Sequence, residues 1–387
     1  MNILIVMPHF YPAANYGGPV ISSFKTCKEL AKLGHNVSVS TSNVNQNGKL
    51  DVKLNTRIKI SDNFYVKYYN ETIKNRFSLP LTLGVFRDIK NSDVVHIQYV
   101  FNYSTVVALL YSYILRKKTI LSPRGCLGKW CLEHGSRLKI FWNKLLIKPL
   151  TKNTIWHATS KQECDDIINQ FGDVKVIISP NGIDLEEYKD ITPISKKEFI
   201  SRYIPNYSRN DYNKLVVSLG RIQKKKGFDI LIKSFTNLLN DFPESILVIA
   251  GPDEGEKENL FDLIAKNKMQ DNIFIIDSIY GRDKLHFLNA ADVFALPSHN
   301  ENFGNVYLES LAAGTPILAS KHTPWSIVEQ FGCGQWVNND EVSVTNALKL
   351  LFEGDAYHLH KNSLKCAQNY SWKNSAEIIS NALDNLK

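Results

Sequence analysis

Short apolar runs alternate with longer amphipathic stretches along almost the whole chain. Such runs are typical of parallel strands that are buried on both faces, and the stretches between them, such as residues 20–33 and 137–150, have the length of helices. The alternation predicts parallel sheets joined by crossover helices. The expected strands are residues 2–7, 37–41, 93–97, 118–121, 154–158, 174–179, 215–219, 246–250, 273–276, 293–296 and 316–319.

A break in this pattern near the middle of the chain predicts two domains. Residues 180–184, Pro-Asn-Gly-Ile-Asp, precede a polar, proline-containing stretch, after which strands and helices resume. We expect two doubly wound α/β domains with a ligand cleft between them, because such sheets bind ligands outside the carboxyl ends of their strands. The first domain is expected to comprise residues 1–182 with a C-terminal helix at 372–387, the linker residues 183–213 and the second domain residues 214–371.

The composition is that of an ordinary globular protein. Of its 387 residues, 44% are hydrophobic and 22% are charged, and the length suits two domains. The longest apolar run, residues 106–115, is far shorter than the ~20 residues that span a bilayer. The N-terminus also lacks the basic segment and cleavage site of a signal peptide, so we expect a cytoplasmic protein. The formal charge of +8 favours anionic partners, although a basic protein without such a partner explains it equally well.

The six cysteines are scattered, and no Cys-x-x-Cys pair occurs. Cys126, Cys131 and His134 lie close together, but a fourth ligand at a recognised spacing is missing. Reduced thiols therefore explain these residues better than a zinc site, and we expect no metal centre.

The segment from Pro297 to Pro316 is the most informative one for function. It predicts a strand end, a loop that carries Glu301, and a helix that starts near Gly304 and carries Glu309 on its second turn. The first backbone N–H groups of such a helix have no partner within the helix and favour an anion. Taken singly, a solvated helix carboxylate and a loop glycine explain Glu309 and Gly304 as well.

A second motif, residues 220–227, reads Gly-Arg-Ile-Gln-Lys-Lys-Lys-Gly and follows an expected strand. Arg221 and Lys226 are suited to a diphosphate, because arginine offers a planar fork and lysine a point charge. An exposed basic loop is the alternative. A third and weaker motif is the pair Gly17-Gly18 between the first strand and the first helix. Neither a Gly-x-Gly-x-x-Gly fingerprint nor a Walker A sequence occurs.

Together these motifs resemble glycosyltransferase family 4, a retaining family with the GT-B fold. The likeness covers nearly the whole chain. It depends on the Glu-x7-Glu motif from Glu301 to Glu309, on residues 220–227 and on residues 180–184, and Gly17-Gly18 and residues 34–37 fit it too. It implies two Rossmann-like domains that face each other across a cleft. The Ser-Pro-Arg-Gly and Glu-Asn-Phe-Gly variants of the motifs indicate a subgroup of bacterial polysaccharide biosynthesis, such as O-antigen or capsule synthesis.

The resemblance also implies roles for individual residues. Glu309 would hold the ribose of a nucleotide sugar, Arg221 and Lys226 would neutralise its diphosphate, and Glu301 would bind the transferred sugar. The implied catalytic residues are therefore Glu301, Arg221 and Lys226. The implied donor-binding residues are Gly17, Gly18, Gly220, Arg221, Lys226, Gly251, Ile279, Tyr280, Glu301, Asn302, Phe303, Gly304, Asn305, Val306 and Glu309.

The sequence departs from the family at one notable position. Many members carry a histidine at the end of a strand of the N-terminal domain, where this chain has Arg124 within Ser-Pro-Arg-Gly. A contact with the donor sugar and a contact with an acceptor phosphate are both open for Arg124. His96, Trp130 and His299 are further candidates for sugar or acceptor contacts, and a structural role explains His96 and His299 equally well.

A basic and aromatic segment lies between Cys126 and Lys152. We expect Lys144, Lys148 and Lys152 to share one helix face, because they are spaced by four residues. Either this face meets an anionic membrane or a polyprenyl-diphosphate acceptor, or it is an ordinary solvated face. No recognition motif for nucleic acid accompanies the charge. The residues of the segment are Trp130, Arg137, Lys139, Trp142, Lys144, Lys148 and Lys152.

The expected activity is that of a retaining hexosyltransferase that needs no metal, since no Asp-x-Asp sequence occurs. Its donor is expected to be a UDP-sugar, with a GDP-sugar as the alternative. Its acceptor is expected to be a glycan or a polyprenyl-diphosphate-linked oligosaccharide, met in the cytoplasm or at the inner face of the cytoplasmic membrane. The competing hypotheses are a sugar-nucleotide epimerase of the same architecture and a non-catalytic nucleotide-sugar binding protein.

Overall fold

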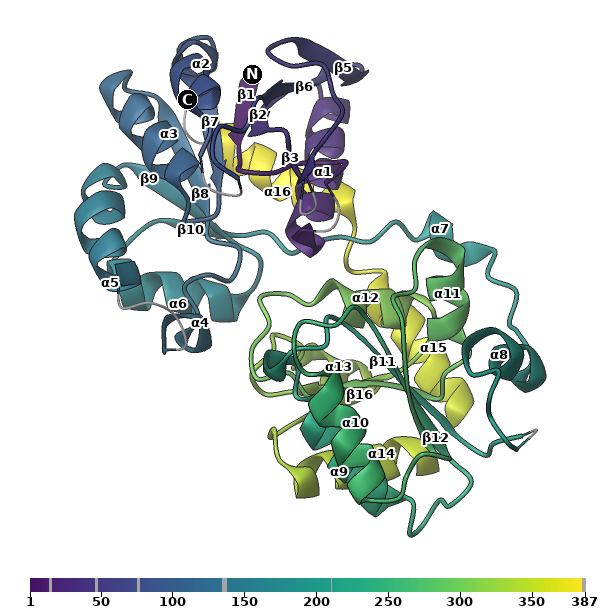
Figure 1. The fold of residues 1–387 in the computed structure, drawn as a ribbon. Helices are drawn as coiled ribbons and strands as arrows, with labels where there is room; N and C mark the ends of the chain where they lie inside the picture. The colour runs from purple at the N-terminus through teal and green to yellow at the C-terminus, as the bar shows by residue number, and fades with distance from the viewer. Residues whose placement is uncertain (14–15, 46–47, 75–76, 134–137, 210, 385–387) are drawn as a thin grey trace. The chain divides into compact units, whose positions relative to one another are not determined.

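The computed structural model describes residues 1–13, 16–45, 48–74, 77–133, 138–209 and 211–384. The chain forms two compact units, which are described separately (Figure 1). Unit 1 comprises Met1–Gly182 together with Trp372–Lys387, and unit 2 comprises Ile183–Ser371. His134 and Arg137, which the sequence suggested as a metal ligand and as part of the basic segment, lie outside the described residues.

Unit 1 is built on one sheet, in which the described strands follow the order β10-β9-β8-β7-β1-β2-β6-β5. All neighbouring pairs are parallel except β5 and β6. The strands are β1 (Asn2–Val6), β2 (Asn36–Ser42), β5 (Arg57–Ser61), β6 (Phe64–Tyr69), β7 (Val94–Gln98), β8 (Lys118–Ser122), β9 (Thr154–Ala158) and β10 (Val176–Ile178). In a separate two-stranded sheet, β3 (Val44–Asn45) pairs antiparallel with β4 (Gly48–Lys49). The switch in strand order lies between β1 and β7.

Helices pack on both faces of this sheet and close two hydrophobic clusters. The C-terminal helix lies beside the first helix (Figure 1). It belongs to one of the clusters, because its Ala376, Ile379 and Leu383 are buried with Cys27 and Leu30 of the first helix. The helices are α1 (Gly18–Lys32), α2 (Leu79–Lys90), α3 (Tyr103–Ile114), α4 (Lys129–Glu133), α5 (Leu138–Trp142), α6 (Lys161–Phe171) and α16 (Trp372–Asp384).

The sequence predicted one helix over residues 137–150, but its described part, residues 138–150, is not a regular α-helix. After α5 the chain widens into a π-helical turn, Asn143–Ile147, and then tightens into a 3-10 turn, Lys148–Leu150. Pro149 has no N–H to donate within a helix, which explains why the α-helical pattern does not continue. Lys144 and Lys148 therefore lie on turns of different pitch, and Lys152 follows the last of them, so the three lysines do not share one α-helical face.

Unit 2 is built on a parallel sheet whose described strands follow the order β13-β12-β11-β14-β15-β16. The order reverses between β11 and β14, which is where doubly wound sheets bind ligands. The strands are β11 (Leu215–Leu219), β12 (Ile246–Ala250), β13 (Ile273–Ile276), β14 (Val293–Leu296), β15 (Ile317–Ser320) and β16 (Gly334–Val337). The helices are α7 (Glu186–Lys189), α8 (Lys196–Tyr203), α9 (Phe228–Leu238), α10 (Lys257–Lys266), α11 (Gly281–Asn289), α12 (Asn305–Ala312), α13 (Ile327–Phe331), α14 (Glu341–Glu353) and α15 (Ala356–Ala367).

The described residues 183–209 and 211–213, for which we expected a linker, belong to unit 2 instead. Phe199 and Tyr203 of α8 and Tyr212 after it are buried in the same core as Phe287 of α11. Aromatic side chains bury large apolar areas, which explains why a stretch that is polar on average still folds against the sheet. None of the helices in the described part of the chain is long and apolar enough to span a bilayer.

Candidate functional site

Two loops meet at the switch point of unit 2. The first follows β11 and holds residues 220–227, and the second follows β14 and holds residues 297–304. The backbone N–H of His299 donates to the carbonyl of Lys225 at 2.8 Å. Gly227 has φ 68°, and a Cβ there would lie 2.2 Å from the carbonyl oxygen of Pro297. Only glycine tolerates both conditions, so the sequence of the first loop fixes its close approach to the second.

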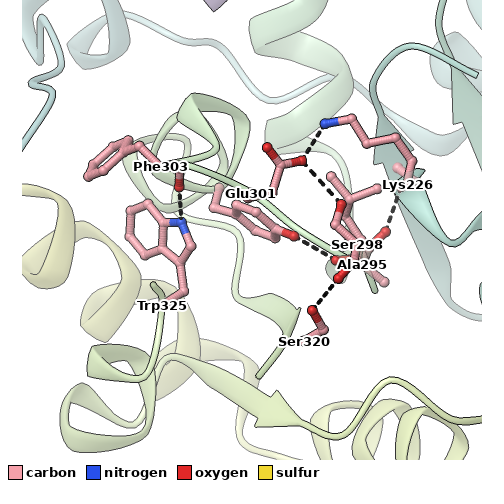
Figure 2. Close-up of polar contacts among 10 residues, drawn as sticks. Lys226, Ala295, Ser298, Glu301, Phe303, Ser320 and Trp325 are labelled. Atoms are coloured by element: carbon pink, nitrogen blue, oxygen red, sulfur yellow. Dashed lines mark hydrogen bonds and ion pairs between the residues drawn. The ribbon is translucent and has the colours of Figure 1, made fainter. Parts of the chain in front are cut away.

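Lys226 and Glu301 form an ion pair between these loops (Figure 2). Their side chains are only 14% and 13% exposed, and the Ser298 hydroxyl donates to the same carboxylate oxygen at 3.1 Å. Burial alone would raise the pKa of Glu301, but the Lys226 ammonium and the Ser298 hydroxyl hold it below its ordinary value. The pair therefore holds a fixed positive and a fixed negative charge at the carboxyl edge of the sheet.

The second loop continues into α12, whose start is held by buried aromatic residues. Gly304, the residue before the helix, has φ 73° and provides no side-chain cap. A Cβ at this position would lie 2.6 Å from the ring of Tyr307, whose hydroxyl donates to the Leu296 carbonyl at 2.6 Å. The Trp325 indole donates to the Phe303 carbonyl, also at 2.6 Å (Figure 2). The position of the helix N-terminus relative to Glu301 is thus set by packing.

Glu309 lies one turn further along α12 and pairs with a different cation. Lys284 of α11 donates to its carboxylate at 2.9 Å, and both side chains are largely buried. Burial first, and then the charges of Glu309 and Glu187, raise the pKa of Tyr188 on α7. The sequence did not point to Lys284 or Tyr188, because nothing in their local pattern marks them.

Arg221 stands apart from the Lys226–Glu301 pair. Its side chain is 55% exposed and its guanidinium donates to Glu254 at 2.9 Å. The backbone around it is fixed, since Ile222 donates to the Pro252 carbonyl at 2.8 Å and Glu254 donates to the Ile222 carbonyl at 2.9 Å. The backbone of Arg221 is therefore held in place, while its guanidinium remains accessible.

The glycines and the remaining candidates of unit 2 occupy different kinds of position. A Cβ on Gly251 would lie 1.8 Å from the Gly220 carbonyl oxygen, so Gly251 serves the close packing of the two loops, whereas a Cβ on Gly220 would only meet the Lys226 side chain at 3.5 Å. Tyr280 precedes α11 and is 73% exposed, whereas Ile279 packs against the core. Three more candidates are partly buried: Asn302 in the loop, and Asn305 and Val306 on the first turn of α12. His299 is also partly buried, and its Nδ1 lies 3.0 Å from Asn339 Nδ2.

In unit 1, Gly17 and Gly18 begin α1 at the carboxyl edge of the sheet. Gly17 has φ 91° and provides no side-chain cap. Trp130, a third candidate, is partly buried on α4. The described residues of the chain include no group of three or more His, Cys, Asp or Glu side chains placed to hold a metal ion.

A small cavity near the switch point of unit 1 was not predicted. It measures about 140 Å³, and its lining includes His9, Tyr16, Glu71, Asn102 and Tyr103. His9 stacks on Tyr16, and burial lowers the pKa of His9 to about 4, so this imidazole is neutral at pH 7. These residues follow the ends of different strands, and strand order was the missing information that would have indicated that they meet.

The other two candidates of unit 1 are buried, His96 within β7 and Arg124 after β8. His96 is 2% exposed and shares the Ser122 hydroxyl with His157, at 2.9 and 2.8 Å. Burial first, then the charge of His157 and that of Arg124, lowers the pKa of His96 well below its ordinary value. His96 therefore belongs to a buried, neutral hydrogen-bonded cluster. Arg124 is also buried, and its Nε donates to the side-chain oxygen of Gln98 at 2.7 Å.

Comparison with known proteins gives consistent matches for both halves of the chain. The family model described as Glycosyltransferase Family 4 matches residues 16–187, and that described as Glycosyl transferases group 1 matches residues 200–362. The D-inositol 3-phosphate glycosyltransferase of Xylanimonas cellulosilytica is 29% identical over 169 residues, which are 42% of this chain and 39% of that protein. The chain thus aligns with less than half the length of this relative.

Solved structures match over the whole chain. The sucrose-phosphate synthase of Thermosynechococcus elongatus superposes with a TM-score of 0.75 at 18% identity, covering 100% of this chain and 98% of that one. Anabaena HepE in complex with UDP gives a TM-score of 0.71 at 17% identity, covering 100% of both chains. At such identities the likeness establishes the fold.

Proposed function

Because the chain belongs to the GT-B glycosyltransferases, with one family domain matching in each half, we propose that it transfers a sugar from a nucleotide diphosphate donor to an acceptor. The observation that carries this proposal is the buried Lys226–Glu301 pair at the switch point of unit 2, directly before the N-terminus of α12. A fixed cation and a helix N-terminus suit a diphosphate, and a fixed carboxylate suits sugar hydroxyls.

Each role of the donor site has a residue of suitable chemistry. Lys226 and the accessible guanidinium of Arg221 neutralise the diphosphate. Glu309, oriented by Lys284, accepts hydrogen bonds from the ribose hydroxyls. Glu301 and the first amides of α12 bind the transferred sugar. UDP is the favoured nucleotide, since HepE, which shares the fold, binds UDP.

The chemical step follows from this placement of charge. As the sugar separates from the diphosphate, negative charge grows on the leaving oxygen, and preorganised cations stabilise that charge without reorientation. Lys226 and Arg221 supply positive charge that a metal ion supplies in other sugar-nucleotide enzymes, so we propose transfer without a metal requirement. Retention of the anomeric configuration follows if the acceptor attacks from the side of the leaving phosphate, which then takes the acceptor's proton.

The acceptor is proposed to be a glycan or a lipid-linked oligosaccharide of a bacterial polysaccharide pathway, met at a membrane surface. The supporting observation is the segment from α5 to the 3-10 turn, where Leu138, Ile140, Phe141 and Leu145 are 60–72% exposed among several lysines. Exposed apolar side chains beside lysines suit an anionic bilayer surface. Replacing Phe141 and Leu145 by serine should weaken co-sedimentation with vesicles containing phosphatidylglycerol. Unchanged co-sedimentation would contradict this membrane contact.

A thermal-shift screen tests the donor site. The full chain is heated with UDP, GDP or dTDP, each in the presence of either magnesium or a chelator. We expect one nucleotide to raise the melting temperature in both conditions. A rise that needs magnesium would contradict metal independence, and no rise with any nucleotide would contradict the donor site. An epimerase would convert the donor without an acceptor, and a non-catalytic binding protein would bind it unchanged.

A further inference from the structure

Arg124 is a buried cation at the carboxyl end of β8. Only 8% of its surface is exposed. It follows Pro123 in the turn after the strand and has φ 57°, a conformation that is uncommon for residues other than glycine and that concentrates at functional sites. The next residue, Gly125, also has a positive φ of 76°. The backbone therefore directs the start of this side chain at the edge where ligands of such sheets bind.

The guanidinium of Arg124 is only partly satisfied. Its Nε–H donates to Gln98 at 2.7 Å. Within the described residues, its two terminal nitrogens make no hydrogen bond and no ion pair. Arginine carries five N–H donors in a planar fork, so the four that remain are those that bind a phosphate or carboxylate with two parallel hydrogen bonds.

The nearby buried carboxylate does not pair with Arg124. Glu163 is engaged elsewhere: one oxygen accepts from the Gly125 N–H at 2.7 Å, and the other accepts from the Thr159 N–H and hydroxyl at 2.7 and 2.9 Å. Its charge stabilises the guanidinium only from a distance. Burial still outweighs that attraction and lowers the pKa of Arg124 below its ordinary value.

The two histidines that interact with Arg124 supply no counter-charge. Burial lowers the pKa of His157 to about 3, with the charge of Arg124 contributing further, so this imidazole is neutral at pH 7. His96 is neutral for similar reasons. A cation that is buried without a paired anion is costly. An anionic ligand group would remove that cost.

We propose that Arg124 binds an anionic group, a phosphate or a carboxylate, carried by the substrate at the carboxyl edge of unit 1. The inference rests on the proposed transferase function and adds a charge requirement to it. Two sources have this chemistry: the carboxylate of a uronic acid in the donor, or a phosphate of the acceptor. Arg124 is then a specificity residue that discriminates charged substrates from neutral ones.

Calorimetric titration of the full chain distinguishes the two sources. For the donor, UDP-glucuronate is compared with UDP-glucose. For the acceptor, inorganic phosphate is titrated while UDP is kept saturating. Wild type is expected either to bind UDP-glucuronate more tightly than UDP-glucose or to bind inorganic phosphate in the presence of UDP. Arg124→Gln should weaken that binding about 10-fold to 100-fold, the value of one charge-assisted hydrogen bond or more. Arg87→Gln is the matched control, since it removes the same charge from an exposed site on α2.

The stability of the variants separates ligand binding from a structural role. Arg124→Gln keeps a donor for Gln98 and removes the buried charge, so its melting temperature without ligand should not fall. If this variant does not fold, Arg124→Lys is used in its place. It should still weaken binding of the charged probe about tenfold, because lysine lacks the planar fork. The proposal would be overturned if wild type and variant bound every probe equally. It would also be overturned if wild type bound neither charged probe. Failure of the transferase function would instead appear as no binding of UDP by wild type, and the phosphate titration would still test Arg124.

Discussion

Lys226 and Glu301 pair with each other, and the two other candidate ligand-binding charges of unit 2 pair elsewhere. Arg221 contacts Glu254, and Glu309 contacts Lys284. Of the three pairs, the one between Lys226 and Glu301 is the most buried, and the Arg221 side chain is the most exposed. The same substitution to a neutral residue should therefore have different consequences for folding and for activity at each position.

Lys226→Met should reduce both stability and turnover. It leaves the Glu301 carboxylate buried without its partner, and breaking a buried pair typically costs about 3 to 5 kcal/mol in the free energy of unfolding. Urea unfolding measures this loss. The double variant Lys226→Met/Glu301→Gln should recover most of the stability and none of the activity. A double variant as unstable as the single one would contradict the pairing.

Arg221→Ala should reduce turnover about 100-fold, the size expected for the loss of one preorganised donor to the developing charge. Its stability should change by no more than about 0.5 kcal/mol, because exposed ion pairs contribute little. Initial rates and thermal unfolding check both statements. Arg209→Ala, at another exposed position of unit 2, is the control and should leave the rate unchanged. Near-normal turnover of Arg221→Ala would exclude its phosphate role.

Glu309→Gln should weaken nucleotide binding only by removing the contact with the ribose. We expect the Kd for UDP to rise about 10-fold or more, the value of a hydrogen bond to a charged group, while the Kd for inorganic pyrophosphate stays the same. Lys284→Met is the companion variant, and it should weaken UDP binding less, because it only orients Glu309. Equal weakening of UDP and pyrophosphate by Glu309→Gln would show that Glu309 does not act on the ribose.

Unit 1 should lose stability as the pH falls below about 6.5. The pKa of His9 is lowered by burial from 6.5 to about 4, so between these values the unfolded chain binds a proton that the folded chain does not. Stability then rises with pH across this window, by up to about 1.4 kcal/mol per pH unit for one proton. Calorimetric unfolding from pH 7 to pH 4.5 should show a shallower slope for His9→Asn than for wild type. A slope for His9→Asn equal to that of wild type would contradict the shift.

The buried parallel strands were predictable, because continuous apolar runs such as residues 215–219 and 246–250 leave few alternatives. Three strands of the two main sheets were missed: β5 alternates charged and apolar residues, its neighbour β6 mixes tyrosines and a lysine with apolar residues, and β16 is short and begins with a glycine. The π-helical and 3-10 turns after α5 were also missed. Pro149 has no N–H to continue the helix, and the hydrophobic periodicity of the sequence does not show which kind of turn replaces it.

The candidate site was predictable in its motifs but not in its partners. Residues 220–227 and Glu301 were found from the sequence, and Gly227 with its positive φ explains why the two loops meet. Glu254 and Lys284 were not found, since pairing across elements depends on strand order and helix rotation. For the same reason the sequence left the partners of Arg124 open.

The measurement that tests the central claim most directly is release of nucleoside diphosphate from a nucleotide sugar by the full chain, with and without lipid-linked oligosaccharide extracted from bacterial membranes. Mass spectrometry of the oligosaccharide and NMR of the new linkage are recorded on the same reaction, in the presence of a chelator. The account predicts acceptor-dependent release, an oligosaccharide heavier by one sugar, and the anomeric configuration of the donor. Donor conversion without an acceptor, or an unchanged donor in a protein that binds it, would contradict the transferase function.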